Sequence, residues 1–389
     1  MKVLVKQLPI GFSQFASNTM PRQVNRSLLF QLVRREQSIS RAELARVSGM
    51  QRSTVSLIVE ELIADGWIVE GAMGKLPRGR HPMFLKINNQ RAVIALDIHP
   101  EHMVVAVGDL SGKIIGQSMI KLPKTAGQAI QAIIRAVGGL IAANREKRFE
   151  GIGISLPGRT DLELQKLIFA PNLRWPVPTI KARIERATGL NVQIDNVANA
   201  CALAEVWFGY SDGLHDLVVV NVSEGVGAGI YANGQILRGE NGMAGEFGHV
   251  QVEDGGPLCA CGNRGCWEQS ASNRAGLRYF NDIAPNRGVT TFEELAQLGR
   301  DDDPAALEAL GKMSRSLGRG LRMIALALAP REIVIVGDIS GVWPKVGAEV
   351  EKEMCRDFIA RPPILRCAYD GHEARLRSAV ALVLHQRFI

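Results

Sequence analysis

The chain has 389 residues and a formal net charge of +7, from 46 lysines and arginines against 39 aspartates and glutamates. This length allows two or three domains, each with its own hydrophobic core. No apolar run approaches the roughly 20 residues needed to cross a bilayer, and the polar segment Ser13–Asn18 makes the N-terminus a poor signal peptide. We therefore expect no membrane insertion. Cysteine usage agrees with a reducing, cytoplasmic location.

The positive charge is unevenly distributed along the chain. Residues 1–90 contain 13 of the basic and only 6 of the acidic side chains, so the whole excess lies in the first quarter. A basic module on a neutral body is typical of nucleic-acid binding. A basic surface that serves solubility alone is the alternative at this point.

This basic segment predicts three helices. Apolar residues follow one face of Arg22–Arg35, and Ser40-Arg-Ala-Glu43 is typical of a capping box that opens a second helix. A turn at Gly49 leads into a third helix, from about Gln51 to Asp65, although Ser or Thr would be a commoner cap than Gln51. Residues expected to face outward from its start are Gln51, Arg52, Ser53, Thr54 and Ser56.

Two predicted strands, Trp67–Glu70 and Met83–Ile87, bracket a basic, glycine-containing loop. This is the outline of a winged helix-turn-helix, in which the third helix enters the major groove and the wing contacts the DNA backbone or minor groove. We predict DNA contacts from the outward residues of the third helix and from three wing residues, Lys75, Arg78 and Arg80. A three-helix protein-binding module is the alternative, and the charge and the wing favour DNA. The predicted DNA-binding domain spans residues 1–88.

Residues 89–389 form the predicted body, where apolar strands alternate with helices. Two β-hairpins are expected, and each opens an α/β half, so we predict an internally duplicated fold with a cleft between two lobes. The segments that carry this prediction are the strands Val93–Ile98, Met103–Val107 and Gly151–Ser155, the helix Ala126–Asn144, and the later strand Leu217–Val222 with its glycine turn Gly225–Gly229.

The run Cys259-Ala-Cys261-Gly-Asn-Arg-Gly-Cys266, ten residues after His249, is the strongest local motif. Three thiols so close together cannot all pair as disulfides, and with the histidine they make a Cys3His set typical of a structural zinc site. Four protein ligands leave no position for a catalytic water. A redox pair or three incidental thiols is the alternative. Two acids without a role in zinc chemistry, Glu246 and Glu268, flank the set.

These motifs resemble the ROK family (repressors, open reading frames, sugar kinases) in its transcriptional-regulator branch. The strongest matches are Gly245-Glu-Phe-Gly-His249 and Cys259-x-Cys-Gly-x-x-Gly-Cys266-x-Glu268, and the resemblance extends from Pro21 onward. It implies an α/β protein with an N-terminal winged helix-turn-helix and a two-lobed, actin-like (sugar kinase/ribonuclease H-like) body. It also implies a zinc ion on the cysteines and histidine, and a hexose-type ligand in the cleft.

Kinase activity would require a carboxylate that accepts the proton of the attacking hydroxyl. In kinases of this family, the base is the third residue of the segment that here runs from Asp195 to Asn199, and that residue is Val197. Asp195 shares a face with Val197 if the segment is extended. Compared with the phosphate turns of these kinases, the corresponding segments Asp97–Glu101 and Ser223–Gly225 each contain an additional glutamate. A Gly-Gly pair of the kinases corresponds here to Gly337-Asp338. We therefore predict a degenerate kinase that is not an enzyme and does not use ATP.

The sugar side matches the family better. Amide and carboxylate side chains suit neighbouring sugar hydroxyls because they accept or donate hydrogen bonds. The predicted ligand residues are Asn172, Asn196, Glu246, His249 and Glu268. His249 would use one ring nitrogen for zinc and the other for the ligand. The alternative is that Glu246 and Glu268 only order the zinc loop.

The leading interpretation is a DNA-binding regulator, a repressor of carbohydrate-metabolism genes, that responds to a sugar or sugar derivative. A two-fold operator requires a dimer, so a homodimer or homotetramer is expected. A sugar kinase with a fused DNA-binding head is the second interpretation. A regulator whose body binds a protein is the third.

Overall fold

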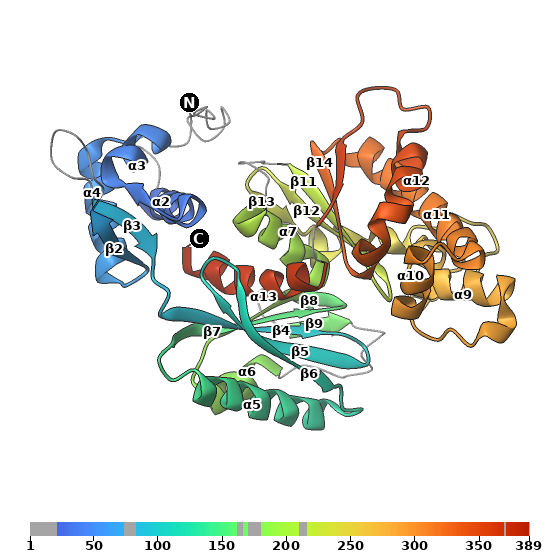
Figure 1. Ribbon diagram of the computed structural model, residues 1–389, viewed down its shortest axis with the longest axis horizontal. Coiled ribbons are helices and arrows are strands. Elements are labelled where there is room, and N and C mark those ends of the chain that lie inside the picture. Colours follow the sequence, from blue (N-terminus) through green and yellow to red (C-terminus); the bar gives the residue numbers. More distant parts are fainter. Residues whose placement is uncertain are drawn as a thin grey trace.

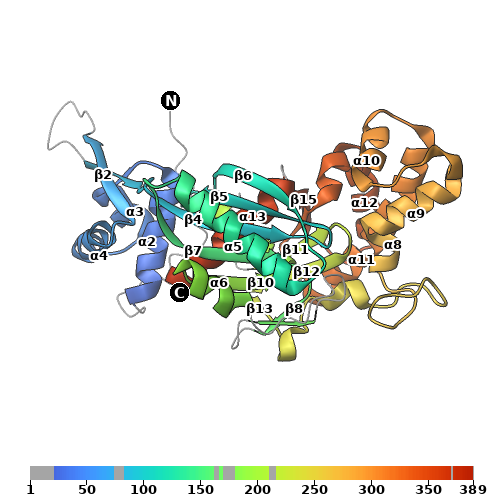
Figure 2. The same cartoon turned by 90° about the horizontal axis from the view of Figure 1, so that it is seen from below.

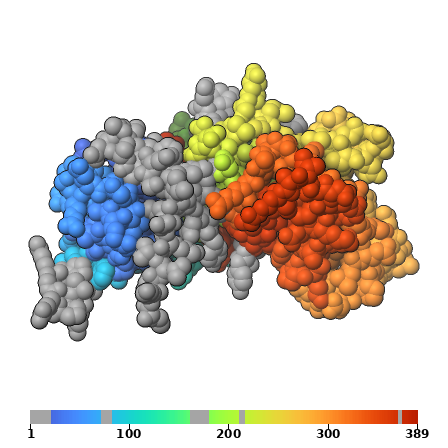
Figure 3. All heavy atoms as spheres, turned by 90° about the horizontal axis from the view of Figure 1, so that it is seen from above, coloured from blue at the N-terminus to red at the C-terminus, as the bar shows by residue number. Residues whose placement is uncertain are grey.

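The computed structural model describes residues 22–73, 83–161, 166–169, 180–209, 216–368 and 371–388. Three parts follow each other in space: an N-terminal module, a first lobe and a second lobe (Figure 1). In the space-filling view, the blue N-terminal atoms and the orange and red atoms of the second lobe occupy opposite ends of the molecule (Figure 3).

The N-terminal module has the predicted helices and strands. Helix α3 (Arg41–Ser48) starts where the Ser40 hydroxyl accepts a hydrogen bond from the Glu43 amide, and it ends at Gly49 with φ of 71°. A three-stranded antiparallel sheet in the order β1-β3-β2 completes the winged helix-turn-helix. The remaining bounds are α2 (Arg22–Glu36), β1 (Ile39–Ser40), α4 (Arg52–Ala64), β2 (Ile68–Met73) and β3 (Met83–Ile87).

Lobe I contains a five-stranded sheet in the order β10-β7-β4-β5-β6. Strand β4 (Arg91–Ile98) is buried along its whole length, because Ile94 and Leu96 enter one core while Val93 and Ala95 enter another. The other bounds are β5 (His102–Asp109), β6 (Ile114–Lys121), α5 (Ala126–Ala143), β7 (Arg148–Leu156), β8 (Arg159–Asp161), β9 (Lys166–Phe169), α6 (Ile180–Thr188) and β10 (Val192–Asn196).

Helices α5 and α6 cover one face of this sheet (Figure 2). By length and composition alone, α5 is the one helix among the described residues that would be long and apolar enough to cross a membrane. Its Ile130, Ile133 and Val137 are buried against the sheet of lobe I, so its apolar face belongs to the protein core.

Lobe II repeats the strand arrangement of lobe I. Its sheet order is β13-β12-β11-β14-β15, again an antiparallel meander joined to two parallel strands. The predicted duplication is therefore confirmed. Its bounds are β11 (Leu217–Val222), β12 (Val226–Ala232), β13 (Gln235–Leu237), η1 (Glu240–Gly242), η2 (Glu246–His249), α8 (Glu268–Ala271), α9 (Asn273–Ile283), η3 (Pro285–Arg287), α10 (Phe292–Arg300), α11 (Pro304–Leu328), β14 (Glu332–Val336), η4 (Asp338–Val342), α12 (Trp343–Cys355) and β15 (Ile364–Cys367).

Two helices join the lobes, α7 (Val197–Phe208) and α13 (Gly371–Phe388). They pack on each other, α7 against the sheet of lobe II and α13 against that of lobe I (Figure 1). Glycines permit the close approach, because a Cβ at Gly153 would lie 1.8 Å from the carbonyl oxygen of Ala379 and one at Gly229 would lie 2.1 Å from that of Ala198. One continuous apolar core includes these helices and the N-terminal module.

Two details differ from the sequence-based expectations. The glycine-rich segment after β11 forms a turn only at its start, because Val226–Ala232 is strand β12. Val197 lies in the first turn of α7, whose N-cap is Asn196, so Asp195 and Val197 do not lie on one extended strand. The condition under which the two side chains would share a face is therefore not met, because the Asn196 side chain accepts a hydrogen bond from the Ala198 amide and begins the helix there.

Candidate ligand cleft and metal cluster

A cavity of about 480 Å³ opens between the lobes and has polar side chains from both of them. Four of the five predicted ligand residues lie in or beside it: Asn196, Glu246, His249 and Glu268. The fifth, Asn172, lies outside the described residues, as do the wing residues Lys75, Arg78 and Arg80. This volume suits a small molecule, at the position where ligands bind in two-lobed α/β folds.

Val197 also lines the cavity and is 5% exposed. The nearby carboxylate, Asp195, is buried and already engaged, since it pairs with Arg238 at 2.7 Å and accepts a hydrogen bond from Thr160 at 3.0 Å. Asn196 donates to the Gly158 carbonyl at 2.8 Å while it caps α7. Among the described residues, this wall therefore has amide groups and no unpaired carboxylate beside Val197.

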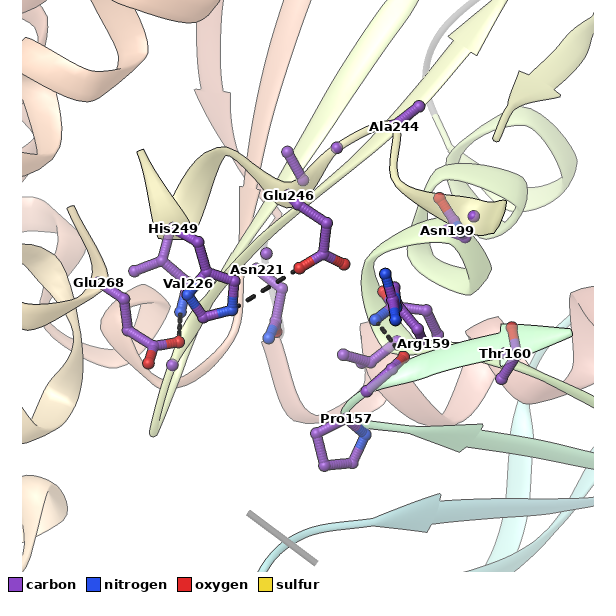
Figure 4. A pocket seen from close by; sticks show the side chains of 18 of the residues that line it. Pro157, Arg159, Thr160, Asn199, Asn221, Val226, Ala244, Glu246, His249 and Glu268 are labelled. Atoms are coloured by element: carbon purple, nitrogen blue, oxygen red, sulfur yellow. Dashed lines mark hydrogen bonds and ion pairs between the residues drawn. The ribbon is translucent and has the colours of Figure 1, made fainter. Parts of the chain in front are cut away.

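The opposite wall comes from the turn η2 and from α8. The His249 Nε2 atom lies 3.6 Å from Glu246, toward the cavity (Figure 4). Its Nδ1 atom lies 3.5 Å from the Cys259 sulfur. The ring thus connects the cavity with the cysteine cluster. Glu268 accepts a hydrogen bond from the Val226 amide at 3.2 Å, which ties the cysteine loop to strand β12.

The cysteine cluster brings four potential metal-donor atoms together. The donor atoms of His249, Cys259, Cys261 and Cys266 all lie within 4.8 Å of one another. Two of the separations are 3.5 Å, from the Cys259 sulfur to His249 Nδ1, and 3.7 Å, from the Cys261 sulfur to that of Cys266. Zn–S bonds of about 2.3 Å and Zn–N bonds of about 2.0 Å in a tetrahedron require separations of about 3.6 and 3.8 Å. The four residues can therefore hold a metal ion.

Trp267 fixes this cluster to lobe II. Its ring is fully buried and its indole nitrogen donates to the Ser316 carbonyl at 2.9 Å. A Cβ at Gly320 of α11 would lie 1.9 Å from the ring, so only glycine leaves room for it. A tryptophan between Cys266 and Glu268 thus holds both residues against a rigid helix.

The corner that corresponds to the phosphate turns is filled by an ionic cluster that the sequence did not reveal. Arg375 of α13 donates to both carboxylate oxygens of Asp97, each at 2.9 Å, and to the Ser223 hydroxyl at 3.2 Å. His99 bridges Asp97 at 2.9 Å and Glu224 at 3.3 Å. Arg375, Asp97 and His99 are each no more than 2% exposed. Charged side chains thus occupy the corner and are satisfied by one another.

Ionisation in this cluster follows from its pairing. Burial alone would raise the pKa of Asp97, but Arg375 and His99 hold it well below its usual range. Burial and the Arg375 charge alone would lower the pKa of His99, whereas Asp97 and Glu224 raise it to about 9. At neutral pH, two cations therefore face two carboxylates in the corner.

The predicted DNA-contact residues of α4 lie at the surface of the N-terminal module. Gln51, Arg52 and Ser53 are exposed, and Thr54 and Ser56 are half-buried. The apolar side chains of the helix face the core, among them Val55 and Leu62. As the unusual cap predicts, Gln51 makes no side-chain hydrogen bond at the start of the helix.

Comparison with known families decides the relationship. The model of the ROK family matches residues 93–386, three quarters of the chain. The chain belongs to the ROK family. A second model, winged helix-turn-helix DNA-binding, matches residues 24–69. Both the resemblance stated from the motifs and the predicted fold are thereby confirmed.

Three similar proteins show which members of the ROK family this chain resembles. The xylose repressor of Bacillus subtilis is 30% identical over 343 residues, which are 87% of this chain and 88% of the repressor. A ROK family glucokinase from Streptomyces griseus, solved with glucose and AMPPNP, is 29% identical with a TM-score of 0.68 over 74% of this chain and 97% of its own. A ROK family transcriptional regulator, a homolog of the Escherichia coli MLC protein, shares the fold at 23% identity and a TM-score of 0.74, over 94% and 98%.

Proposed function

We propose that this ROK protein is a DNA-binding transcriptional regulator controlled by a sugar or sugar derivative in the cleft between its lobes. The observation that carries the proposal is the union, in one core, of a winged helix-turn-helix with a ROK body that has Val197 at the base position. Residues 1–88 would bind DNA and residues 89–389 would bind the effector. Similarity to the xylose repressor supports a repressor of carbohydrate genes.

The cleft is proposed to have lost phosphoryl transfer. Val197 cannot accept a proton, Asp195 is held by Arg238 and Thr160, and Glu224 faces the corner where nucleotide phosphates would lie. An added phosphate would be repelled by that carboxylate. Glu246, His249, Glu268 and Asn196 are proposed as effector contacts, because their amide, carboxylate and ring nitrogen groups suit vicinal hydroxyls.

Zinc is the proposed metal of the Cys3His cluster. Thiolates and an imidazole at tetrahedral spacing are the ligand set that structural zinc prefers. A bound zinc ion would supply cross-links between distant parts of the loop rather than chemistry. Because the His249 ring contacts the cluster through Nδ1 and faces the cavity through Nε2, the ion would fix the orientation of the ring toward the effector.

Two-fold symmetric operators are the usual targets of such helices, so we propose that the protein acts as a homo-oligomer, a dimer or a tetramer. A cytoplasmic location follows from a function on DNA. No membrane insertion is proposed, since the apolar face of α5 is packed on the sheet of lobe I.

The DNA-binding part is tested by a gel-shift titration on a duplex selected from random sequences by the wild-type protein. Arg52→Ala should weaken binding about tenfold or more, because it removes a charged contact at the start of α4. Arg319→Ala, an exposed arginine on lobe II, is the matched control and should leave affinity unchanged. Unchanged affinity in the Arg52 variant would exclude α4 as the reading helix.

The effector part is tested by a thermal-shift screen with D-xylose, D-glucose and N-acetyl-D-glucosamine among a wider panel. A stabilising sugar should lose its effect in Glu246→Gln and should alter the gel shift of the wild-type protein. No response to any sugar, together with a protein captured by the body, would favour regulation by a protein partner. Robust turnover in a coupled ATP-consumption assay would contradict the loss of kinase chemistry.

A further inference from the structure

The ionic cluster of Asp97, His99, Glu224 and Arg375 connects the two lobes. Asp97 and His99 lie at the end of β4 in lobe I, whereas Ser223 and Glu224 form the turn between β11 and β12 in lobe II. On the lobe I side, Arg375 of α13 donates two hydrogen bonds of 2.9 Å to Asp97 of β4. The contacts to lobe II are longer, 3.2 Å to Ser223 and 3.3 Å to Glu224. Opening of the cleft would act on these contacts to Ser223 and Glu224, because they are the ones that cross between the lobes.

The same cluster forms part of the cavity wall. Ser223, Glu224 and Arg375 line the cavity together with Pro100, which follows His99. The side chain of Glu224 is 32% exposed, whereas that of His99 is 2% exposed. A ligand in the cavity therefore meets the lobe II half of the cluster directly.

Helix α13 leads from this cluster to the DNA-binding module. Arg375 lies in its second turn and Phe388 is its last residue, so the 18-residue helix spans about 27 Å. The Phe388 ring stacks on Phe30 of α2 with centroids 4.2 Å apart and planes inclined by 13°. It also meets Trp67 edge-on at 4.9 Å, and the Arg26 guanidinium lies over it at 5.4 Å. In Figure 1, α13 passes below α7 and ends beside α2.

The intervening helix is closely packed along its length. Its buried side chains include Val380 and Leu384, and its backbone rests on β7 at Gly153 without an intervening side chain. Packed helices move as units and do not deform continuously, because protein interiors are close-packed. A displacement at Arg375 is therefore carried to Phe388.

We propose that α13 couples the effector cavity to the DNA-binding module, with Arg375 as the positioning residue at the cavity end and Phe388 as the residue that holds the module. Lobe closure sets the contacts of Arg375 and His99 with the turn of Ser223 and Glu224. The resulting position of α13 determines where Phe388 holds Phe30 and Trp67, and therefore how α4 is oriented toward DNA. The inference rests on the proposed function only in naming the cavity an effector site.

The test is hydrogen–deuterium exchange of the full chain without DNA or sugar, so its outcome is independent of the tests of the proposed function. Glu224→Gln weakens the contact with His99 at a partly exposed side chain, and the fold should tolerate it. Glu349→Gln is the matched control, because Glu349 of α12 is about equally exposed, at 31%, and pairs with the surface cations Arg315 and Lys352.

Glu224→Gln should raise amide exchange about threefold or more in two separated segments, the first half of α13 and helix α2. The control should raise neither. The single substitution Phe388→Ala should already raise amide exchange in α2. In the double variant with Glu224→Gln, amide exchange should rise in α13, with no further rise in α2. Phe388→Leu should restore part of the coupling.

Two results would overturn the proposal. One is a Glu224→Gln variant in which exchange rises around the cavity while α2 keeps its wild-type rate. The other is a uniform rise in every segment of the chain, which would mean that the substitution lowers global stability and leaves no specific route through α13.

Discussion

The raised pKa of His99 predicts how the stability of the protein changes with pH. The imidazolium lies between the carboxylates of Asp97 and Glu224, with the Arg375 guanidinium and the stacked His102 ring, 4.1 Å away, also facing it. Its folded pKa is about 9, against an ordinary value of 6.5 for histidine. Because the folded value is the higher one, the stabilisation is fully present below about pH 6.5 and is lost as pH rises through about 9.

The free energy that protonated His99 contributes to folding follows from the shift in its pKa. Each pKa unit corresponds to about 1.4 kcal/mol, so protonated His99 contributes about 3 kcal/mol below pH 6.5. Other groups also titrate between pH 7 and 10. The quantity to compare is therefore the difference in unfolding free energy between the wild type and His99→Gln. That difference in unfolding free energy should fall by about 3 kcal/mol between pH 6 and pH 10.

The assay is denaturant unfolding followed by tryptophan fluorescence at a series of pH values. His102→Gln is the control, because burial and the neighbouring His99 charge lower the pKa of His102 and its contribution therefore lacks this alkaline loss. If the wild type and His99→Gln differ by the same free energy at pH 6 and pH 10, the imidazolium does not stabilise the corner and the reasoning fails.

Three further predictions concern the metal loop and the N-terminal module. Cys259→Ser with Cys261→Ser should lose the bound zinc measured by atomic absorption and lower the melting temperature by roughly 5–10 °C; full stability without metal would contradict a structural ion. Gly320→Ala should destabilise the protein by about 3 kcal/mol in denaturant unfolding, because its Cβ would meet the Trp267 ring. Gly311→Ala, on the same helix, would bring its Cβ to 3.4 Å from the flexible Arg315 side chain, which is an ordinary contact. It should instead be neutral or stabilising by up to about 1 kcal/mol, and equal effects of the two substitutions would exclude the clash. Ser40→Ala should cost about 1 kcal/mol through loss of the α3 cap, with Ser40→Asp retaining most of it; an Ala variant as stable as the Asp variant would show that the cap does not matter.

Local signals predicted the elements that depend on neighbours in sequence. The helix expected at 126–144 is Ala126–Ala143, and Ser40 caps the helix that follows it. Both depend on propensity, capping and periodicity within a few residues. The spacing of the cysteines likewise brought the metal donors together, since most of them lie in one short loop.

Features that depend on long-range packing escaped prediction. Asp97 and Arg375 are 278 residues apart in sequence, so nothing near either one indicates the pair. The sequence left open whether the segment from Asp195 to Val197 is extended, and the Asn196 cap places Val197 in a helix. The backbone approach at Gly229 explains why a glycine-rich stretch is a strand here, because α7 packs directly on it.

The ionic corner also bears on why Asp97 persists in a cleft that is proposed to have lost nucleotide chemistry. A buried carboxylate without cations would cost several kcal/mol, and here Arg375 and the protonated His99 satisfy it. Both cations are already paired with carboxylates, and the carboxylate of Glu224 beside them is partly exposed, at 32%. A nucleotide would bring further negative charge to a corner whose positive charge is already matched, and its phosphates would have to break the pairs that stabilise the lobes. We therefore expect the cleft to respond to a ligand beside the corner, and to do so without competition from ATP.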